Sequence, residues 1–514
     1  MSLSDRTNGQ LWTSLFLLGL LINFQGCQKN EPSLSGLDHD GVSRKHLANI
    51  QSDESGLSAH LTLHRTGGLD EIISKRYVRI LTTSNSFDYF IHEGNARGFQ
   101  YEMAKAFIDW LNQKYLRESP LKIQFELVPL HRDQLVPELL AGKGDFIAAD
   151  IAIDSKSPQS ETKSVAYSKP YRAVDQWIIT HFPVESYRRL EDFSGKQFAV
   201  QKSSASYSYI IELNNKLKAS NREPVQIELV DEELEAENLL ELVSLKKYDF
   251  IIADSHIAEI GLVVFENLRR VPKLTLGKKL PVSWVVPKSS RKLLTHINEF
   301  LPKFNTGTEH GNLNINKYYR NFNQIKNHLE KNNKTNTLSP FDHWIQKYSR
   351  LYSLDWRLMA ALCYQESLFN FEARSDQGAI GLFQIKSTTA SEPYIGIPDI
   401  SGIENIPNNI HAGIKYFQWI KKSHFDGIVE LPEKEKLRFT LAAYNAGPST
   451  ILRARELTTE MGLNPNQWFR NIEMAAIALD RIQTVKYVSE INKRYVSYVI
   501  YGFDPNPEIT REEP

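Results

Sequence analysis

One acidic residue interrupts an apolar helical pattern in the C-terminal half of the chain. The residues on one stripe of this helix are Trp356, Met359, Cys363 and Glu366, spaced three, four and three apart. Such spacing places side chains on one face, and Asp355 precedes them as an N-cap. A carboxyl group on an apolar face loses hydration, which raises its pKa and lets it hold a proton near neutral pH. A general acid needs this property. A lone Glu on a helix is usually structural, however, so the residues around Glu366 must show whether it is catalytic.

Those surrounding segments resemble the lysozyme-like catalytic domain of the soluble lytic transglycosylases, over roughly residues 339–501. The matching segments are ES (366–367), ARSDQGAIGLFQI (373–385), NIHAGIKYF (409–417), AYNAG (443–447) and QTVKYVSEI (483–491). Five segments in one order are far more specific than any single one. The resemblance implies that Glu366 is the only catalytic acid and base.

The same resemblance implies roles for further residues. Those implied to line the sugar-binding cleft are Gln384, Tyr444, Asn445 and Tyr487, and those implied to support it by hydrogen bonds are Ser367 and Ser375. Two positions depart from the family pattern. Phe383 stands where Met is usual, which keeps the bulk and reshapes the sugar surface. Gln483 replaces a usual Glu, so the rate or pH dependence would differ if that Glu tunes Tyr487.

The implied reaction uses a single carboxyl group. Hydrolytic glycosidases need two, so here the substrate must supply the rest. Glu366 would protonate the oxygen between N-acetylmuramic acid and N-acetylglucosamine and then deprotonate the muramic C6 hydroxyl, which closes a 1,6-anhydro ring. The sequence has no His or Cys spacing typical of a metal site, so no metal and no cofactor are expected. A hydrolytic muramidase and a non-catalytic solute-binding or wall-docking lipoprotein remain as alternatives.

The N-terminal half predicts a different architecture. Strand and helix patterns alternate between Leu69 and Phe304 and restart once, which indicates an α/β protein of two lobes. The segments GFQYEMAKAF (98–107), LLAGKGDFIAADIAI (139–153), YSKPY (167–171) and YDFIIAD (248–254) resemble the family-3 extracellular solute-binding proteins, periplasmic receptors for amino acids. The resemblance implies a ligand cleft between the lobes.

The residues implied for that cleft match the family only in part. Asp254 stands where an Asp takes the ligand ammonium group. The Arg that clamps the ligand carboxylate is absent, since only Lys156 and Lys163 precede YSKPY, and Lys lacks the planar fork of Arg. A peptide or muropeptide is therefore expected rather than a free amino acid, and it is expected to regulate the second domain.

The first 27 residues have the features of a secretion signal. The segment LWTSLFLLGLLINFQGC contains an apolar run of signal-peptide length, ends in small residues and precedes a polar stretch. It is too short for a membrane-spanning helix. Its position before Cys27 resembles a bacterial lipoprotein signal, with plain secretion or an uncleaved anchor as alternatives. The chain is thus expected in the periplasm, anchored by a lipid to a membrane, the outer membrane of a Gram-negative bacterium.

Charge and composition complete the sequence prediction. Lys plus Arg and Asp plus Glu number 61 each, so no overall charge attracts nucleic acid, and peptidoglycan strands are the expected partner. The predicted fold is an α/β bilobal periplasmic-binding-protein domain followed by a mainly α lysozyme-like domain. The predicted segments are a signal (1–27), a flexible tether (28–68), the solute-binding domain (69–304), a linker (305–338), the catalytic domain (339–505) and a tail (506–514).

Overall fold

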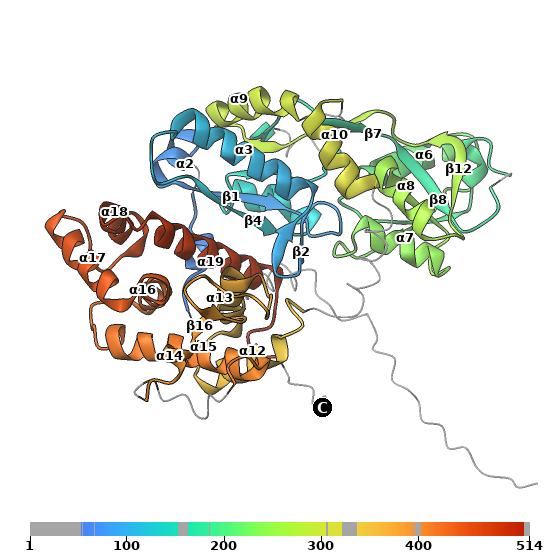
Figure 1. Ribbon diagram of the computed structural model, residues 1–514. Coiled ribbons are helices and arrows are strands. Elements are labelled where there is room, and N and C mark those ends of the chain that lie inside the picture. Colours follow the sequence, from blue (N-terminus) through green and yellow to red (C-terminus); the bar gives the residue numbers. More distant parts are fainter. Residues whose placement is uncertain are drawn as a thin grey trace, which may run out of the picture. The chain divides into compact units, whose positions relative to one another are not determined.

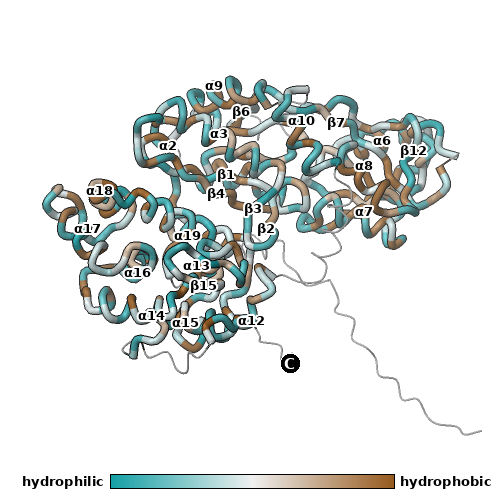
Figure 2. The backbone as a smooth tube through the Cα atoms, in the orientation of Figure 1, coloured by the Kyte–Doolittle hydropathy of each residue, from teal (hydrophilic) through white to brown (hydrophobic). Residues whose placement is uncertain are grey.

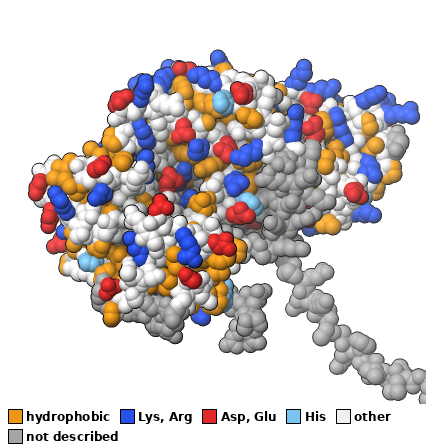
Figure 3. All heavy atoms as spheres, in the orientation of Figure 1, with side chains coloured by type: hydrophobic (Ala, Val, Ile, Leu, Met, Phe, Trp, Pro, Cys, Tyr) orange, Lys and Arg blue, Asp and Glu red, His pale blue; other side chains and the backbone are white. Residues whose placement is uncertain are grey.

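The computed structural model describes residues 53–507 apart from 54, 66, 153–162, 185, 305–306, 321–336, 394 and 396–401. Cys27 with its signal, and Lys156, lie outside the described residues. None of the helices in this described part combines the length and apolar character needed to cross a membrane. Lys, Arg, Asp and Glu side chains are interspersed over the face seen in Figure 3, in keeping with the even charge balance.

The first lobe of the N-terminal domain is built on a five-stranded sheet of order β4-β1-β5-β14-β6. Its strands are β1 (Tyr77–Thr82), β4 (Gln124–Pro129), β5 (Phe146–Ile147), β6 (Val165–Tyr167) and β14 (Val285–Pro287), and a hairpin of β2 (Phe90–His92) and β3 (Asn95–Arg97) adjoins it. β1 runs parallel to β4 and β5, whereas β14 is antiparallel to β5 and β6. The chain therefore returns from the second lobe to complete this sheet.

Helices cover the sheet of the first lobe (Figure 1). They are α2 (Leu69–Lys75), α3 (Phe99–Tyr115), the 3-10 helix η2 (Arg132–Gln134), α4 (Leu135–Leu140), α9 (Arg291–Phe300) and the 3-10 helix η4 (Leu301–Lys303). The helix predicted from FQYEMAKAFIDWLNQKY is α3, and its Met103, Phe107 and Leu111 are fully buried. Hydrophobic residues concentrate on β1 and β4 in Figure 2, because these strands lie inside the lobe.

The second lobe has its own five-stranded sheet, of order β10-β9-β11-β8-β12. Its strands are β8 (Gln176–Thr180), β9 (Gln197–Val200), β10 (Gln226–Leu229), β11 (Phe250–Asp254) and β12 (Arg269–Thr275), and its helices are η3 (Leu190–Phe193), α6 (Ala205–Ala219), α7 (Ala236–Ser244) and α8 (Ser255–Val264). The two crossings between the lobes pair as β7 (Arg172–Val174) and β13 (Leu280–Val282). The domain ends in α10 (Glu309–Ile315) and the π-helix η5 (Asn316–Arg320).

The C-terminal domain is mainly helical. Its helices are α12 (Asp342–Leu351), α13 (Trp356–Ser367), α14 (Ser387–Ala390), α15 (Ile406–Ile420), η6 (Lys421–Phe425), α16 (Glu433–Ala446), α17 (Pro448–Glu460), η7 (Trp468–Ile472), α18 (Glu473–Ala478) and α19 (Ile482–Tyr501). The short strands β15 (Ala379–Ile380) and β16 (Ile385–Lys386) form a small ladder. Helix α13 is buried along most of its length and packs against α12 and α19. The predicted fold class is confirmed in both domains.

The predicted tether includes a segment that is folded. The 3-10 helix η1 (Ala59–Thr62) lies within it, and Leu57 and Leu61 are buried. Asp53 accepts a hydrogen bond from Tyr495 of the catalytic domain, with 2.7 Å between the oxygens. Leu57 and Leu61 are only two apolar residues in a polar stretch, too few to show the spacing of a helix or a strand. The sequence therefore did not predict this folded segment.

Candidate active site

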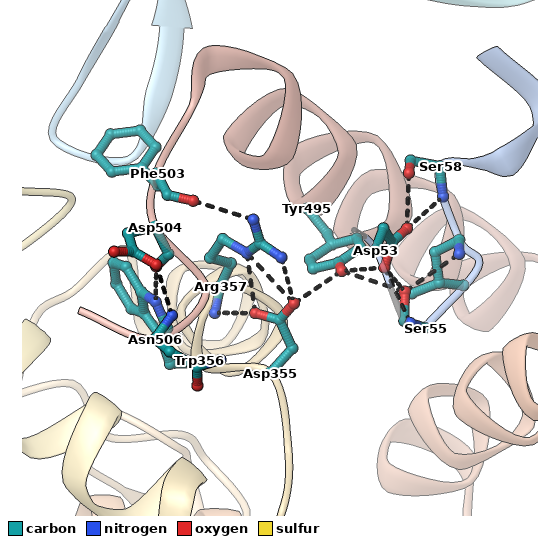
Figure 4. A network of polar contacts seen from close by, with 11 residues as sticks. Asp53, Ser55, Ser58, Asp355, Trp356, Arg357, Tyr495, Phe503, Asp504 and Asn506 are labelled. Carbon is teal, nitrogen blue, oxygen red and sulfur yellow. Dashed lines mark hydrogen bonds and ion pairs between the residues drawn. The ribbon is translucent and has the colours of Figure 1, made fainter. Parts of the chain in front are cut away.

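Helix α13 carries Glu366 in its last turn. As predicted, Asp355 caps the helix: its side chain accepts from the Arg357 amide at 2.9 Å. The Arg357 guanidinium returns to the same carboxylate at 2.7 Å and donates to the Phe503 carbonyl at 3.0 Å (Figure 4). Leu368, in the left-handed region at φ 54°, ends the helix. The first turn is thus held rigidly, and Glu366 projects from an ordered helix end.

The Glu366 carboxyl group lies at the edge of the buried helix face and is half-buried. Loss of hydration raises its pKa to about 7, and a hydrogen bond from the Tyr487 hydroxyl to its Oε1 acts in the opposite direction. Among the described residues no charged group contributes to this shift. The carboxyl group is therefore protonated in a large fraction of molecules near neutral pH.

Two phenol groups stand beside this carboxyl group. Tyr487, on α19, is buried and donates to Glu366. Tyr444, near the end of α16, is half-buried and donates to the Phe383 carbonyl at 2.8 Å. Burial, and next the charge of Glu366, raise the pKa of both phenols. Both remain neutral hydroxyl donors at any physiological pH.

The other predicted site residues mainly hold backbone. Gln384 adopts φ 45°, and its amide donates to the carbonyls of Ala373 at 3.1 Å and Gly381 at 2.9 Å. The Ser375 hydroxyl accepts from the Ala379 amide at 3.0 Å. These bonds fix the loop that carries Phe383.

Ser367 and Asn445 also bond away from Glu366. The Ser367 hydroxyl donates to the Cys363 carbonyl at 3.1 Å, one turn back in α13. The Asn445 side chain accepts from the Thr484 hydroxyl at 2.8 Å and so joins α16 to α19. The structure thus brings Glu366, Tyr487 and Tyr444 together, while the remaining predicted residues order the backbone around them.

Sequence reasoning gave no role to Asn409, which organises the loop from within α15. Its side chain is buried, accepts from the Phe383 amide at 2.9 Å and donates to the Ile380 carbonyl at 2.9 Å. Gly381 lies so close that an added Cβ would stand 2.4 Å from the Asn409 amide nitrogen. Gly413 likewise leaves room for the Phe383 ring, since a Cβ there would lie 2.3 Å from that side chain. An Asn inside an otherwise apolar helix face was the signal available.

The N-terminal domain has a small cavity between its lobes, of about 100 Å³. Asp254 lines it and accepts from Gln176 at 3.4 Å. Burial raises the pKa of Asp254, while His256 acts in the opposite direction. Arg132, from the first lobe, also lines the cavity and donates to the Asp150 carbonyl at 2.8 Å. Asp254, which the family resemblance implies for the ligand ammonium group, is thus placed in the lining of this cavity.

The same cavity is rich in carboxyl groups that sequence reasoning missed. Asp88, Asp150, Glu235 and Glu237 line it. Burial and then the charge of Glu237 raise the pKa of Glu235 to about 8. Asn85 and Ser86 of the first lobe donate to Glu235 and Glu237 of the second, at 3.5 and 2.8 Å. Acidic residues scattered along the sequence gave no motif from which this cluster could be read.

Two family models match parts of this chain. The model of the transglycosylase SLT domain matches residues 343–465, and the model of the bacterial extracellular solute-binding proteins, family 3, matches residues 78–319. A protein named membrane-bound lytic murein transglycosylase F from Desulfosudis oleivorans is 28% identical over 440 residues, 84% of this chain and 86% of the relative. One of the same name from Pseudoalteromonas translucida is 28% identical over 445 residues, 85% of this chain and 84% of the relative.

Solved structures of solute-binding proteins match the N-terminal half of the chain. An ancestral amino acid-binding protein, described as a precursor of cyclohexadienyl dehydratase, is 21% identical and covers 49% of this chain and 99% of its own, with a TM-score of 0.39. A mutant of ArgBP from T. maritima is 23% identical and covers 49% of this chain and 98% of its own, also with a TM-score of 0.39.

The chain therefore joins a family-3 solute-binding domain to a transglycosylase SLT domain, and it is a peptidoglycan lytic transglycosylase. It resembles, over most of its length, the proteins named membrane-bound lytic murein transglycosylase F.

Proposed function

We propose that Glu366 cleaves the β-1,4 bond between N-acetylmuramic acid and N-acetylglucosamine without water and leaves a 1,6-anhydromuramoyl end. The observation that carries this proposal is a carboxyl group whose pKa is raised to about 7 by burial, with a phenol and no charged group among the causes in the described residues. A proton is available for the leaving oxygen, and the same group then becomes the base. A general acid or base supplies roughly 10²–10⁴-fold in rate.

Each neighbour has a role in this scheme. The Tyr487 hydroxyl donates to Glu366, so it stabilises the carboxylate formed when the proton leaves. That carboxylate then takes the proton of the muramic C6 hydroxyl, and the C6 oxygen closes onto C1. The N-acetyl carbonyl of the muramic residue supports the positive charge that develops at C1. Tyr444 and the loop of Phe383 form the adjoining wall for the sugar.

The test is digestion of purified murein by the full chain in detergent, with the products weighed by mass spectrometry. We expect anhydro-muropeptides, and a loss of about 10³-fold in rate for Glu366→Gln. Glu473→Gln is the matched control, because Glu473 is a buried Glu of the same domain whose pKa is also raised to about 7. Products that carry one added water would identify a muramidase. Absence of products would favour a wall-docking protein, and retained activity in Glu366→Gln would remove Glu366 from its role.

We also propose that the N-terminal domain binds a peptide or muropeptide in the cleft between its lobes and thereby regulates the catalytic domain. Asp254 would take an ammonium group. Coupling requires the ligand to bind one arrangement of the protein better than another.

Titration of a muropeptide against the full chain tests this second proposal. We expect saturable binding that Asp254→Asn weakens and that changes the turnover of murein. Lys218→Gln, at an exposed position of α6, is the control. Binding without any change in turnover would refute regulation while leaving the receptor function in place.

Membrane attachment is the third part of the proposal. Cys27 would carry the lipid, and the relatives named above are called membrane-bound. Cys27→Ser should release the protein into the soluble periplasmic fraction. Retention in the inner-membrane fraction would point to an uncleaved anchor instead.

A further inference from the structure

A cavity of about 1070 Å³ lies between the first lobe and the catalytic domain. Its walls come from α3, the loop before β4 and the segment from η1 to β1 on one side, and from α16, η7 and α19 on the other. Neither Glu366 nor Asp254 lines it. Its volume lies just above the range of about 300–1,000 Å³ for ligand pockets, so it can hold more than a single inorganic ion.

Positive charge dominates the lining of this cavity, with twelve Lys and Arg residues against five Asp and Glu residues. Part of this charge is neutralised locally. Arg438 pairs with Glu435 at 2.6 Å, and Lys105 pairs with Asp109 at 3.3 Å. The excess that remains makes an anion the favoured occupant.

Two arginines account for the most unusual part of the lining. Arg76 follows α2 in the first lobe, and its Nη1 is buried with no hydrogen-bond partner among the described residues. Arg470 belongs to η7 of the catalytic domain. Burial, and next the charge of Arg470, lower the pKa of Arg76. Both side chains line the cavity, and neither forms an ion pair within the part of the chain that the structure describes.

The backbone at both arginines is also unusual. Arg76 has φ 57° and Arg470 has φ 67°, so both lie in the left-handed region that residues with a side chain seldom adopt. Strained backbone of this kind persists where the surrounding structure enforces it, and it clusters at binding sites. Both arginines line the same cavity, so two like charges share one space, which costs free energy unless an anion lies between them.

We propose that this cavity binds an anion bearing phosphate or carboxylate groups, held jointly by Arg76 and Arg470. A guanidinium group matches the oxygen pairs of either anion with two parallel hydrogen bonds. The orphan Nη1 of Arg76 gains its missing acceptor. Because one arginine belongs to each domain, the anion joins the first lobe to the catalytic domain.

The bound anion also adjoins the helix of the active site. Lys486, Ser489 and Lys493 of α19 line the cavity, whereas Tyr487 of the same helix donates to Glu366 on the other side. The site is separate from the cleft between the lobes, and the proposal stands independently of the catalytic and regulatory roles given above.

Binding of pyrophosphate and of citrate to the full chain in detergent, measured by isothermal titration calorimetry, tests the proposal. Sodium chloride at equal ionic strength is the reference. We expect saturable binding of at least one of the two, weakened about tenfold or more by Arg76→Gln and by Arg470→Gln. Lys218→Gln, which removes the same charge outside the cavity, should leave the affinity unchanged.

The two anions distinguish the chemistry of the ligand, since binding of pyrophosphate alone assigns a phosphate and binding of citrate alone assigns a carboxylate. Absence of binding above the chloride reference for both anions would overturn the proposal. So would an unchanged affinity in Arg470→Gln, which lies at an exposed position where loss of the fold is not expected. Because the readout is binding, a negative result leaves the transglycosylase assignment intact.

Discussion

Glu366 in the catalytic domain and Asp150 between the lobes are both carboxyl groups withdrawn from water, yet their protonation differs. Burial raises the pKa of Glu366 to about 7, and only a phenol opposes it. Burial acts in the same direction on Asp150, but His256 at 2.5 Å and Arg172 at 3.7 Å reverse it and hold the pKa of Asp150 well below its usual range. Burial alone thus leaves a carboxyl group able to hold a proton near neutral pH, whereas burial beside charged partners keeps the group ionised.

The largest expected effect comes from removing the buried charge of Asp150, which pairs with His256 and Arg172. Asp150→Asn should lower the free energy of unfolding by about 3–5 kcal/mol, because Arg172 and His256 are left without their buried partner. Urea denaturation at pH 7 measures this loss. Asp109→Asn, at an exposed pair with Lys105, is the control and should change stability by less than about 0.5 kcal/mol. Equal small effects in both variants would remove the distinction between the two carboxyl groups.

The opposite change in stability is expected at Glu366, where replacing the carboxyl group should raise the free energy of unfolding. Its pKa is about 7 in the folded chain against an ordinary value of 4.5, so the protonated form stabilises the fold and this contribution is lost as pH rises between about 4.5 and 7. Glu366→Gln mimics the protonated form. It should be more stable than the parent by about 3 kcal/mol at pH 8 and nearly equal at pH 4. Denaturation of both proteins at the two pH values checks this, and a destabilised variant at pH 8 would contradict it.

The sequence predicted more of the fold than of the electrostatics. Helix α3 and helix α13 with its Asp355 cap follow from local spacing and capping chemistry, which act within a few residues. The stripe through Met359 and Cys363 also placed Glu366 next to buried surface. The pairing of Asp150 with His256 could not be predicted, since it joins residues of separate lobes and depends on the tertiary fold.

The third effect concerns the hydrogen bond from Tyr487 to Glu366. This bond opposes the rise in the pKa of Glu366, so Tyr487→Phe should raise that pKa further and move the alkaline limb of the rate profile to higher pH. The rate at the optimum should fall about tenfold, as expected for one lost hydrogen bond to a charged group. The pH dependence of kcat/KM for release of muropeptides measures both changes.

Tyr444→Phe is the control for this comparison. The Tyr444 hydroxyl donates to the Phe383 carbonyl and not to Glu366, so its removal should leave the position of the alkaline limb unchanged. A shift of equal size in both variants would mean that the two phenols act on Glu366 alike.

The predicted site residues illustrate the same limit of sequence reasoning. The spacing of Glu366 and the family resemblance of Tyr487 and Tyr444 located residues that the fold brings together. The resemblance did not predict that the side-chain amide of Gln384 donates its hydrogen bonds to backbone carbonyls. Side-chain amides and hydroxyls bond to whichever backbone group is nearest, and this neighbour is set by loop geometry, which spacing does not encode.

The smallest effect is expected at the hydrogen bonds of Tyr495, which lie away from both the active site and the cavity between the lobes. The Tyr495 hydroxyl lies 2.7 Å from Asp53 Oδ1 and 2.9 Å from Asp355 Oδ2, so its one proton is shared between the two carboxylates and ties the N-terminal segment to the cap of α13 (Figure 4). Although burial raises it, the pKa of Asp53 is lowered overall by hydrogen bonds from Ser55, Ser58 and Tyr495. The stability that this carboxylate contributes is therefore present at pH 7 and is lost as pH falls through its folded pKa.

Tyr495→Phe should consequently lower the free energy of unfolding by about 1 kcal/mol at pH 7. The difference from the parent should begin to shrink toward pH 3, as pH falls toward the folded pKa of Asp53, which lies below its ordinary value. Tyr348→Phe is the control, since within the described residues its hydroxyl makes no hydrogen bond. Denaturation at pH 7 and pH 3 measures the difference. A loss that does not depend on pH would mean that Tyr495 stabilises α19 by packing and that its bond to the carboxylates contributes little.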